Sequence, residues 1–231
     1  MDRRIGAKSA VWMSDASCSL EDFRTVVEQT TIAADYPLAL GIERNVPIYD
    51  ATVIRKARGD EAAVAAFMAE WNTSFLLGPG IVVFRNAYED MKLIDEVTGV
   101  LSSIMAEELL AIGPRGDHFA KAGDNARLWN AHEKLCIAAP ELFARYNAND
   151  ILALASRSWL GPLYQITAQV NVVYPGGKAQ SPHRDYHMGF QTPGQLRQYP
   201  ANVHRLAAAL TLQGAIAHCD MPVESGPTKL L

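Results

Sequence analysis

The spacing of the apolar residues changes at Gly161-Pro162. Between residues 60 and 160 most apolar residues recur at the period of a helix, whereas residues 163–174 alternate between apolar and polar side chains, as in a half-buried strand. Helices in the first two-thirds of a chain and strands in the last third are typical of an α+β protein, in which a helical layer supports a β-sandwich or barrel.

Four helices are predicted in the first part of the chain. They cover residues 20–31, 60–72, 89–110 and 140–160. Asp60 can cap the second helix, and Pro140 fits the first turn of the fourth. Residues 1–59 otherwise lack a strong period and are interrupted by Pro37 and Pro47, so an irregular lead-in is expected there.

The predicted strands are fewer than a complete barrel requires. They cover residues 81–84, 163–174, 182–190 and 206–216. A double-stranded β-helix, the jelly roll of cupins, has about eight strands, so we expect an incomplete jelly roll supported by N-terminal helices. The expected organisation is a single domain, with a lead-in at 1–59, a mainly helical support at 60–162 and the first part of the jelly roll at 163–231.

The composition excludes several kinds of protein. About half of the 231 residues are apolar, which is enough for a full core, and the formal net charge of -4 argues against a nucleic-acid partner. The N-terminus lacks an apolar signal segment, and the least polar stretch, residues 206–217, is too short to span a bilayer. We therefore expect a cytoplasmic protein without a membrane partner, whose cysteines, Cys18, Cys136 and Cys219, are reduced thiols.

His183-Arg-Asp185 follows the turn Pro175-Gly-Gly177 and is the clearest sign of chemistry in the chain. On an extended strand, residues two apart project to the same face, so this imidazole and this carboxylate can converge on one metal ion. Two histidines and one carboxylate make the facial triad that binds Fe(II) and leaves room for a co-substrate and O2. The triplet alone is common, and its place after an alternating strand and a turn is what favours a metal site. The sequence thus predicts two of three ligands, His183 and Asp185.

Three segments of the C-terminal part carry a family resemblance. They are Gln169-Val-Asn-Val-Val-Tyr-Pro-Gly-Gly177, then Pro182-His-Arg-Asp185, then Ala217-His-Cys-Asp220 with Glu224-Ser-Gly-Pro227. With these segments, residues 60–231 resemble the phytanoyl-CoA dioxygenase family of Fe(II)/2-oxoglutarate oxygenases. The resemblance implies a jelly-roll core, Fe(II) as the metal and 2-oxoglutarate as the co-substrate.

The resemblance also implies roles for single residues. His183 and Asp185 match the first two iron ligands of the family. Asn171 matches a polar residue that the family places near 2-oxoglutarate, and Gln165, expected on the same strand face, could contact substrate or co-substrate. The distal histidine and the arginine that binds the 2-oxoglutarate carboxylate would lie beyond Leu231. On this interpretation the chain is C-terminally truncated, and we expect it to bind Fe(II) weakly and to turn over little.

Other histidines are weaker candidates for the third ligand. His187 shares the predicted strand face, but the strand rise would place it about 13 Å from His183. We expect His204 to be a surface residue and His218 to be a packed or turn residue.

Two histidines precede the predicted barrel. His118 lies in a glycine-rich loop expected over residues 113–125 and is a weak candidate for substrate contact. His132 lies one helical turn from Cys136, but no third group orients this pair as a reactive thiol would require, so structural roles are expected for both.

These features predict an Fe(II)- and 2-oxoglutarate-dependent dioxygenase that uses O2 to hydroxylate a small organic substrate, with succinate and CO2 as the products of the co-substrate. Two alternatives remain open. One is a non-catalytic, cupin-like binding protein, and the other is a metal-dependent hydrolase or isomerase on a cupin barrel. Succinate release on addition of 2-oxoglutarate separates them, because neither alternative produces it. The sequence specifies neither the substrate nor the oligomeric state.

Overall fold

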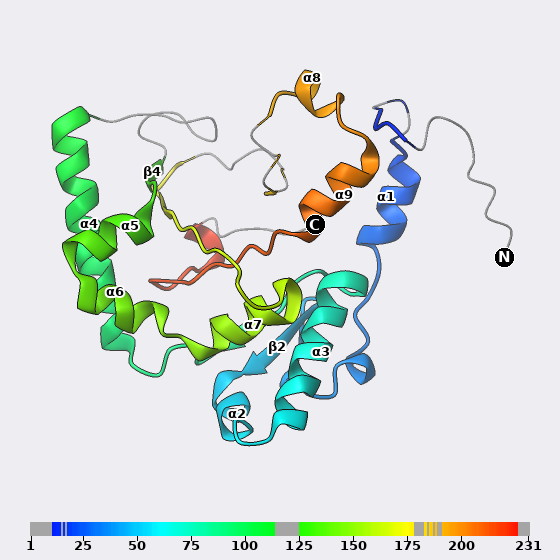
Figure 1. Ribbon diagram of the computed structural model, residues 1–231, viewed down its shortest axis with the longest axis horizontal. Helices are drawn as coiled ribbons and strands as arrows, with labels where there is room; N and C mark the ends of the chain where they lie inside the picture. Colours follow the sequence, from blue (N-terminus) through cyan, green and yellow to red (C-terminus); the bar gives the residue numbers. More distant parts are fainter. Residues whose placement is uncertain are drawn as a thin grey trace, which may run out of the picture. The chain divides into compact units, whose positions relative to one another are not determined.

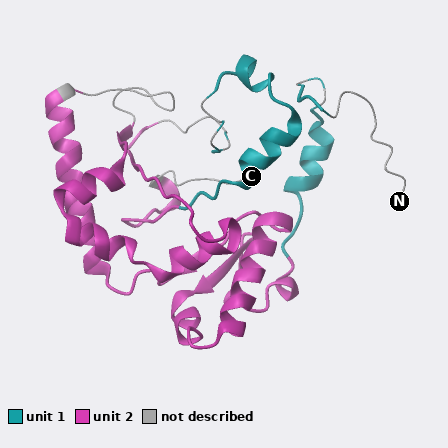
Figure 2. Ribbon diagram, in the orientation of Figure 1, with its two compact units in different colours: residues 1–31, 182–214, 231 teal, residues 32–181, 215–230 magenta. Residues whose placement is uncertain are grey.

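The computed structural model describes residues 11–14, 16, 18–113, 125–177, 183, 185, 186, 188 and 191–225. Helices and short strands are mixed along the chain, which confirms the α+β class (Figure 1). The chain divides into two compact units, each described here by itself (Figure 2). Unit 1 comprises residues 1–31, 182–214 and 231, and unit 2 comprises residues 32–181 and 215–230. The single domain expected from the sequence stays a prediction.

The larger sheet of unit 2 has the order β1 (Gly41–Glu43), β2 (Val46–Asp50), β3 (Val83–Arg85). β1 and β2 form an antiparallel hairpin, and β3 pairs with β2 in parallel. Both hairpin loop residues, Arg44 and Asn45, have positive φ angles, 49° and 68°, which match the turn that best suits the twist of two strands.

This sheet corrects the irregular lead-in expected over residues 1–59. Strands of three and five residues are too short to show a period, and Pro47 lies inside β2, where the sequence suggested an interruption. β2 is followed directly by α2 (Ala51–Lys56), because the Asp50 side chain accepts a hydrogen bond from Thr52 N and caps the helix. A 3-10 turn, Ala33–Asp35, precedes the hairpin. The strand predicted at residues 81–84 is confirmed as β3, shifted by a residue or two.

The second sheet is an antiparallel pair, β4 (Asn125–Leu128) with β5 (Val170–Val173). The strand predicted over residues 163–174 is therefore correct only at its end. Earlier in that segment, Ala168 O accepts a hydrogen bond from Ala131 N, at the first residue of a helix, rather than from a strand. Within the described ranges the strands form these two sheets and no jelly roll is seen.

Three of the four predicted helices are confirmed. They are α1 (Leu20–Val27), α3 (Glu61–Leu77) and α4 (Met91–Ile112). The Asp60 side chain caps α3 as predicted, since it accepts hydrogen bonds from Ala62 N and Ala63 N. The remaining helix, predicted over residues 140–160, is two helices.

The break between α6 (Pro140–Asn147) and α7 (Asp150–Leu160) comes from Asn149. Its Oδ1 accepts hydrogen bonds from Ile151 N and Leu152 N, both at 3.0 Å, and so starts a new helix. Its Nδ2 donates to Ala87 O at 2.7 Å, which joins this start to the segment before α4. Pro140 occupies the first turn of α6, as predicted.

The strand predicted over residues 206–216 is wrong. The segment begins inside α9 (Ala201–Ala209), which follows the short α8 (Pro193–Leu196), and the rest of it has no regular structure. The buried residues of α9 are Ala201, His204 and Ala207, spaced three apart as on one helix face. Alanine has the highest helix propensity, so the alanine-rich start of the segment favours a helix over a strand.

Two hydrophobic cores hold unit 2 together. One contains Ile94, Val97 and Leu101 of α4. α4 contacts α5 (Ala131–Ala138) and α6, which lie beside it (Figure 1). The other surrounds Trp71 of α3, and α7 packs along α3 there. The described part of the chain ends with a 3-10 turn, Val223–Ser225. No helix in the described ranges is long and apolar enough to cross a membrane.

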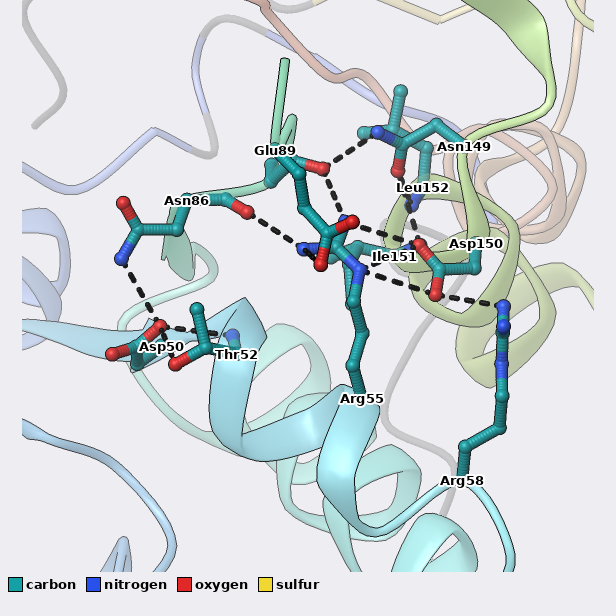
Figure 3. Close-up of polar contacts among 11 residues, drawn as sticks. Asp50, Thr52, Arg55, Arg58, Asn86, Glu89, Asn149, Asp150, Ile151 and Leu152 are labelled. Atoms are coloured by element: carbon teal, nitrogen blue, oxygen red, sulfur yellow. Dashed lines mark hydrogen bonds and ion pairs between the residues drawn. The ribbon is translucent and has the colours of Figure 1, made fainter.

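Arg55 of α2 fixes the start of α7 within unit 2 (Figure 3). Its Nη1 donates to Asn86 O at 2.9 Å and its Nη2 to Ala87 O at 2.6 Å, both in the segment before α4. Its Nε and Nη2 also bond the carboxylate of Asp150, the first residue of α7, at 3.1 to 3.3 Å. Arg58 donates to the same carboxylate at 2.8 Å. One guanidinium thus joins three segments of the fold.

Candidate functional site

The predicted metal ligands lie together in unit 1. His183 Nε2 is 3.4 Å from Asp185 Oδ1, and the side chains are 37% and 34% exposed. The described residues of segment 182–190 do not belong to a strand, so the predicted strand is not found at these positions. The two groups converge without it. Arg184 and His187 lie outside the described residues.

The spacing of these two donor atoms suits a shared metal ion. Two bonds of about 2.1 Å at a right angle separate their donor atoms by about 3 Å, close to the observed distance. Imidazole nitrogen and carboxylate oxygen are also the donor types of the Fe(II) facial triad. His183 and Asp185 therefore fit two of the three protein ligands of such a site.

Gln213 is a third member of this cluster, which the sequence did not single out. Its Nε2 donates to Asp185 Oδ2 at 2.7 Å. Ligating carboxylates are commonly hydrogen-bonded in this way by groups that do not touch the metal. The only available signal in the sequence was an amide side chain within the mostly apolar stretch at residues 206–217.

A third metal ligand is not found in the described part of the chain, where no group of three or more His, Cys, Asp or Glu side chains could hold an ion. His204, predicted to be a surface residue, is buried on α9. Its Nε2 donates to Leu196 O at 2.9 Å, and its Nδ1 lies 3.4 Å from the Tyr186 hydroxyl. Both ring nitrogens have protein partners, so His204 holds α9 in place.

His218 is a packed residue of unit 2, as predicted. The Thr98 hydroxyl donates to Ile94 O at 2.7 Å, so it accepts from Nδ1 of His218, at 2.8 Å. Nε2 of His218 therefore accepts a hydrogen bond of 2.9 Å from the Tyr146 hydroxyl. Burial raises the pKa of Tyr146 to about 12, so this hydroxyl keeps its proton and can donate it. Burial also lowers the pKa of His218 below its ordinary value of 6.5. The ring is therefore neutral in the folded chain and joins α4 to α6.

The free energy of unfolding is expected to decrease when the pH falls below 6.5. Because the folded-state pKa of His218 lies below 6.5, the unfolded chain takes up the proton first. The contribution of His218 to the free energy of unfolding is fully present above pH 6.5 and is lost as the pH falls through the folded-state pKa. Urea unfolding between about pH 8 and pH 5 should show a weaker pH dependence in His218→Gln than in the wild type.

The matched variant for this prediction is His132→Gln. Burial lowers the pKa of His132 too, so it contributes with the same sign and should reduce the pH dependence further in the double variant. A pH dependence that neither substitution changes would contradict the assignment.

Asn171 and Gln165 belong to unit 2. Asn171 lies on β5 opposite Arg127 of β4, and Arg127 Nη2 donates to its Oδ1 at 3.4 Å. The Arg127 guanidinium also lies over the Trp129 ring, 5.3 Å from its centroid. Gln165 is exposed and precedes β5 in a segment without regular structure, so the shared strand face expected for it is not observed. Arg127 was not predicted as a site residue, because a strand of four residues is too short to show a period in the sequence.

An open groove of about 590 Å³ lies beside α5 and α6 in unit 2, with His132, Cys136 and Phe143 among its lining residues. The His132 ring packs edge-on against Phe143, with centroids 5.9 Å apart. Cys136 is a half-buried free thiol, and Cys18 and Cys219 are free as well, as predicted. His118 and most of the loop expected over residues 113–125 lie outside the described residues.

A comparison with known protein families gives a match. Residues 80–231 match the family described as phytanoyl-CoA dioxygenase (PhyH), over more than half of the chain. The chain belongs to this family, as its sequence motifs predicted, and members of the family are oxygenases that generally use Fe(II) and 2-oxoglutarate. No curated protein and no solved structure matches the chain significantly.

Proposed function

We propose that this chain is an Fe(II)- and 2-oxoglutarate-dependent dioxygenase that hydroxylates a small organic substrate, with His183 and Asp185 as iron ligands. The observation that carries the proposal is the 3.4 Å approach of His183 Nε2 to Asp185 Oδ1, inside the region that matches an oxygenase family. Imidazole and carboxylate donors at this spacing suit adjacent positions on one Fe(II) ion.

Bound Fe(II) with 2-oxoglutarate and O2 supplies the oxidising chemistry, which converts 2-oxoglutarate to succinate and CO2 and hydroxylates the substrate. The chain's own residues would hold the metal ion and orient the atoms that bind it. His183 provides a nitrogen donor and Asp185 an oxygen donor, and the Gln213 amide restrains the second carboxylate oxygen. These contacts fix the direction of the donors before a metal arrives.

Asn171 and Gln165 are proposed as contacts to the co-substrate or substrate, on the strength of the family resemblance. The Arg127 side chain strengthens the case for Asn171, since a guanidinium and an amide next to each other on paired strands provide the donors that bind carboxylates. Both acidic groups of 2-oxoglutarate are carboxylates. A double-stranded β-helix core, as in cupins, remains part of the proposal.

Succinate formation tests the proposed function. Wild-type chain incubated with Fe(II), 2-oxoglutarate and air is expected to release succinate slowly but above background, since only two of its metal ligands are identified. His183→Ala and Asp185→Ala are each expected to lower the rate by at least about 100-fold, because removal of either donor leaves the metal weakly held.

Asp95→Ala, at an exposed carboxylate of α4, is the matched control and should retain the wild-type rate. A cupin-like binding protein or a hydrolase would form no succinate in any of these samples. Equal succinate formation by wild type and His183→Ala would refute the assignment of the ligand.

A further inference from the structure

The two carboxylate oxygens of Asp185 have different partners. Oδ1 lies 3.4 Å from His183 Nε2, whereas Oδ2 accepts a hydrogen bond of 2.7 Å from Gln213 Nε2. An amide NH2 group donates hydrogen bonds but does not compete for a metal ion. Gln213 therefore occupies one oxygen of the carboxylate and leaves the other directed at the histidine.

The position of Gln213 follows from the end of α9. Just after this helix, the Thr211 hydroxyl donates to a carbonyl oxygen of its last turn at 3.1 Å, which fixes the start of the segment that carries Gln213. The residue after Asp185 is also held by α9, since the Tyr186 hydroxyl lies 3.4 Å from His204 Nδ1. Two contacts thus connect the Asp185-Tyr186 pair with α9 and the segment that follows it.

We infer that Gln213 is a positioning residue that makes Asp185 bind the metal through Oδ1 alone. The inference rests on the proposed function, in which Asp185 is a metal ligand. A facial triad occupies three coordination positions and leaves the opposite face to the co-substrate and O2. A carboxylate bound through both oxygens would take one of those open positions. The hydrogen bond from Gln213 to Oδ2 keeps that position open.

Co(II) binding to the full chain, followed by visible absorption, tests the role of Gln213. Gln213→Met keeps the length of the side chain and removes the N–H donor. We expect it to bind Co(II) about tenfold more weakly than the wild type, and with a different absorption spectrum, because Oδ2 becomes free to coordinate.

One further variant controls for other effects. Gln198→Met, at an exposed glutamine of the same unit, should change neither the Co(II) affinity nor the absorption spectrum. Thermal unfolding of metal-free Gln213→Met should match that of the wild type, since a residue with a role only in folding would lower the midpoint of the metal-free chain.

The outcomes separate the inference from the proposed function. Wild-type affinity and spectrum in Gln213→Met would overturn the role of Gln213. That result leaves the assignment of the metal ligands intact if His183→Ala abolishes Co(II) binding. Wild-type chain that fails to bind Co(II), or His183→Ala that binds it as tightly as the wild type, overturns the proposed function and the inference with it.

Discussion

Replacing Trp71 with alanine is expected to lower the free energy of unfolding by about 3 to 5 kcal/mol, the range for deleting a large buried aromatic side chain. Trp71 is 0% exposed, at the centre of an aromatic cluster in unit 2. Its ring contacts Tyr49, Phe67 and Phe84, with centroids 5.9, 6.0 and 4.9 Å away. Alanine would leave a cavity in this cluster. The surrounding rings belong to different elements, two strands and a helix, and cannot all move inward to fill it. Urea denaturation followed by circular dichroism measures the effect.

Trp71→Phe is the informative comparison. The indole Nε1 is buried and has no hydrogen-bond partner in the described part of the structure, so the larger ring carries an uncompensated polar group. Phenylalanine removes that group along with some volume, and we expect a loss below about 1.5 kcal/mol. Phe23→Ala, at an exposed aromatic of α1, should change stability by less than about 0.5 kcal/mol. Equal losses in Trp71→Ala and Phe23→Ala would contradict the placement of this core.

Arg55→Met is expected to destabilise the chain by about 2 to 4 kcal/mol, because three acceptors lose a charged donor. Asn86 O loses its donor, whereas Ala87 O keeps the bond from Asn149 Nδ2 and the Asp150 carboxylate keeps the bond from Arg58. The Arg55 side chain is 17% exposed, so water compensates for little of this loss. Methionine keeps much of the apolar volume of the arginine stem, and the measured effect therefore reports the lost hydrogen bonds more than lost packing.

Arg58 provides the matched control for Arg55, since it bonds the same Asp150 carboxylate from a side chain that is 68% exposed. Arg58→Met should cost less than about 1 kcal/mol, as is usual for surface ion pairs. In a double-mutant cycle, Arg55→Met and Asp150→Ala should show a coupling of at least about 1 kcal/mol. Additive effects, or a larger loss in Arg58→Met than in Arg55→Met, would mean that Arg55 does not join α2 to α7.

The long helices could be predicted because their cause is local. Asp60 caps α3 from the position that the sequence indicates, and α4 keeps one apolar stripe from Leu93 to Met105. The capping role of Asn149 is local as well, but it lies inside an apolar pattern that continues from α6 into α7, so the break between them was missed. Periodicity alone does not distinguish one long helix from two consecutive helices whose apolar residues continue the same pattern.

The strands could not be predicted as well, because strand formation depends on partners elsewhere in the chain. β1, β2 and β3 are too short to show alternation, and residues 163–169 alternate without forming a strand. The segment at residues 206–216 is apolar in every position but Thr211, Gln213 and Gly214, a pattern that fits a strand or a buried helix equally. Its alanines favour the helix that is observed in its first part.

The candidate site likewise has a part that the sequence predicts and a part that depends on contacts between distant residues. The His183-Arg-Asp185 triplet is visible in the sequence because its spacing and its context are local. Gln213 reaches Asp185 across 28 residues, and Arg127 reaches Asn171 across 44, so neither contact leaves a pattern in the sequence. Such contacts become apparent only once the chain is folded.

Release of CO2 from 2-oxoglutarate labelled at carbon 1 tests the central claim most directly, because that carbon leaves only when the co-substrate is oxidatively decarboxylated. We expect the wild-type chain to release labelled CO2 slowly but above background with Fe(II) in air, and not under nitrogen. His183→Ala and Asp185→Ala should fall to the background rate, and Asp95→Ala should match the wild type. Release that is independent of O2, or that persists in either ligand variant, would contradict the account, as would a wild-type chain that releases none.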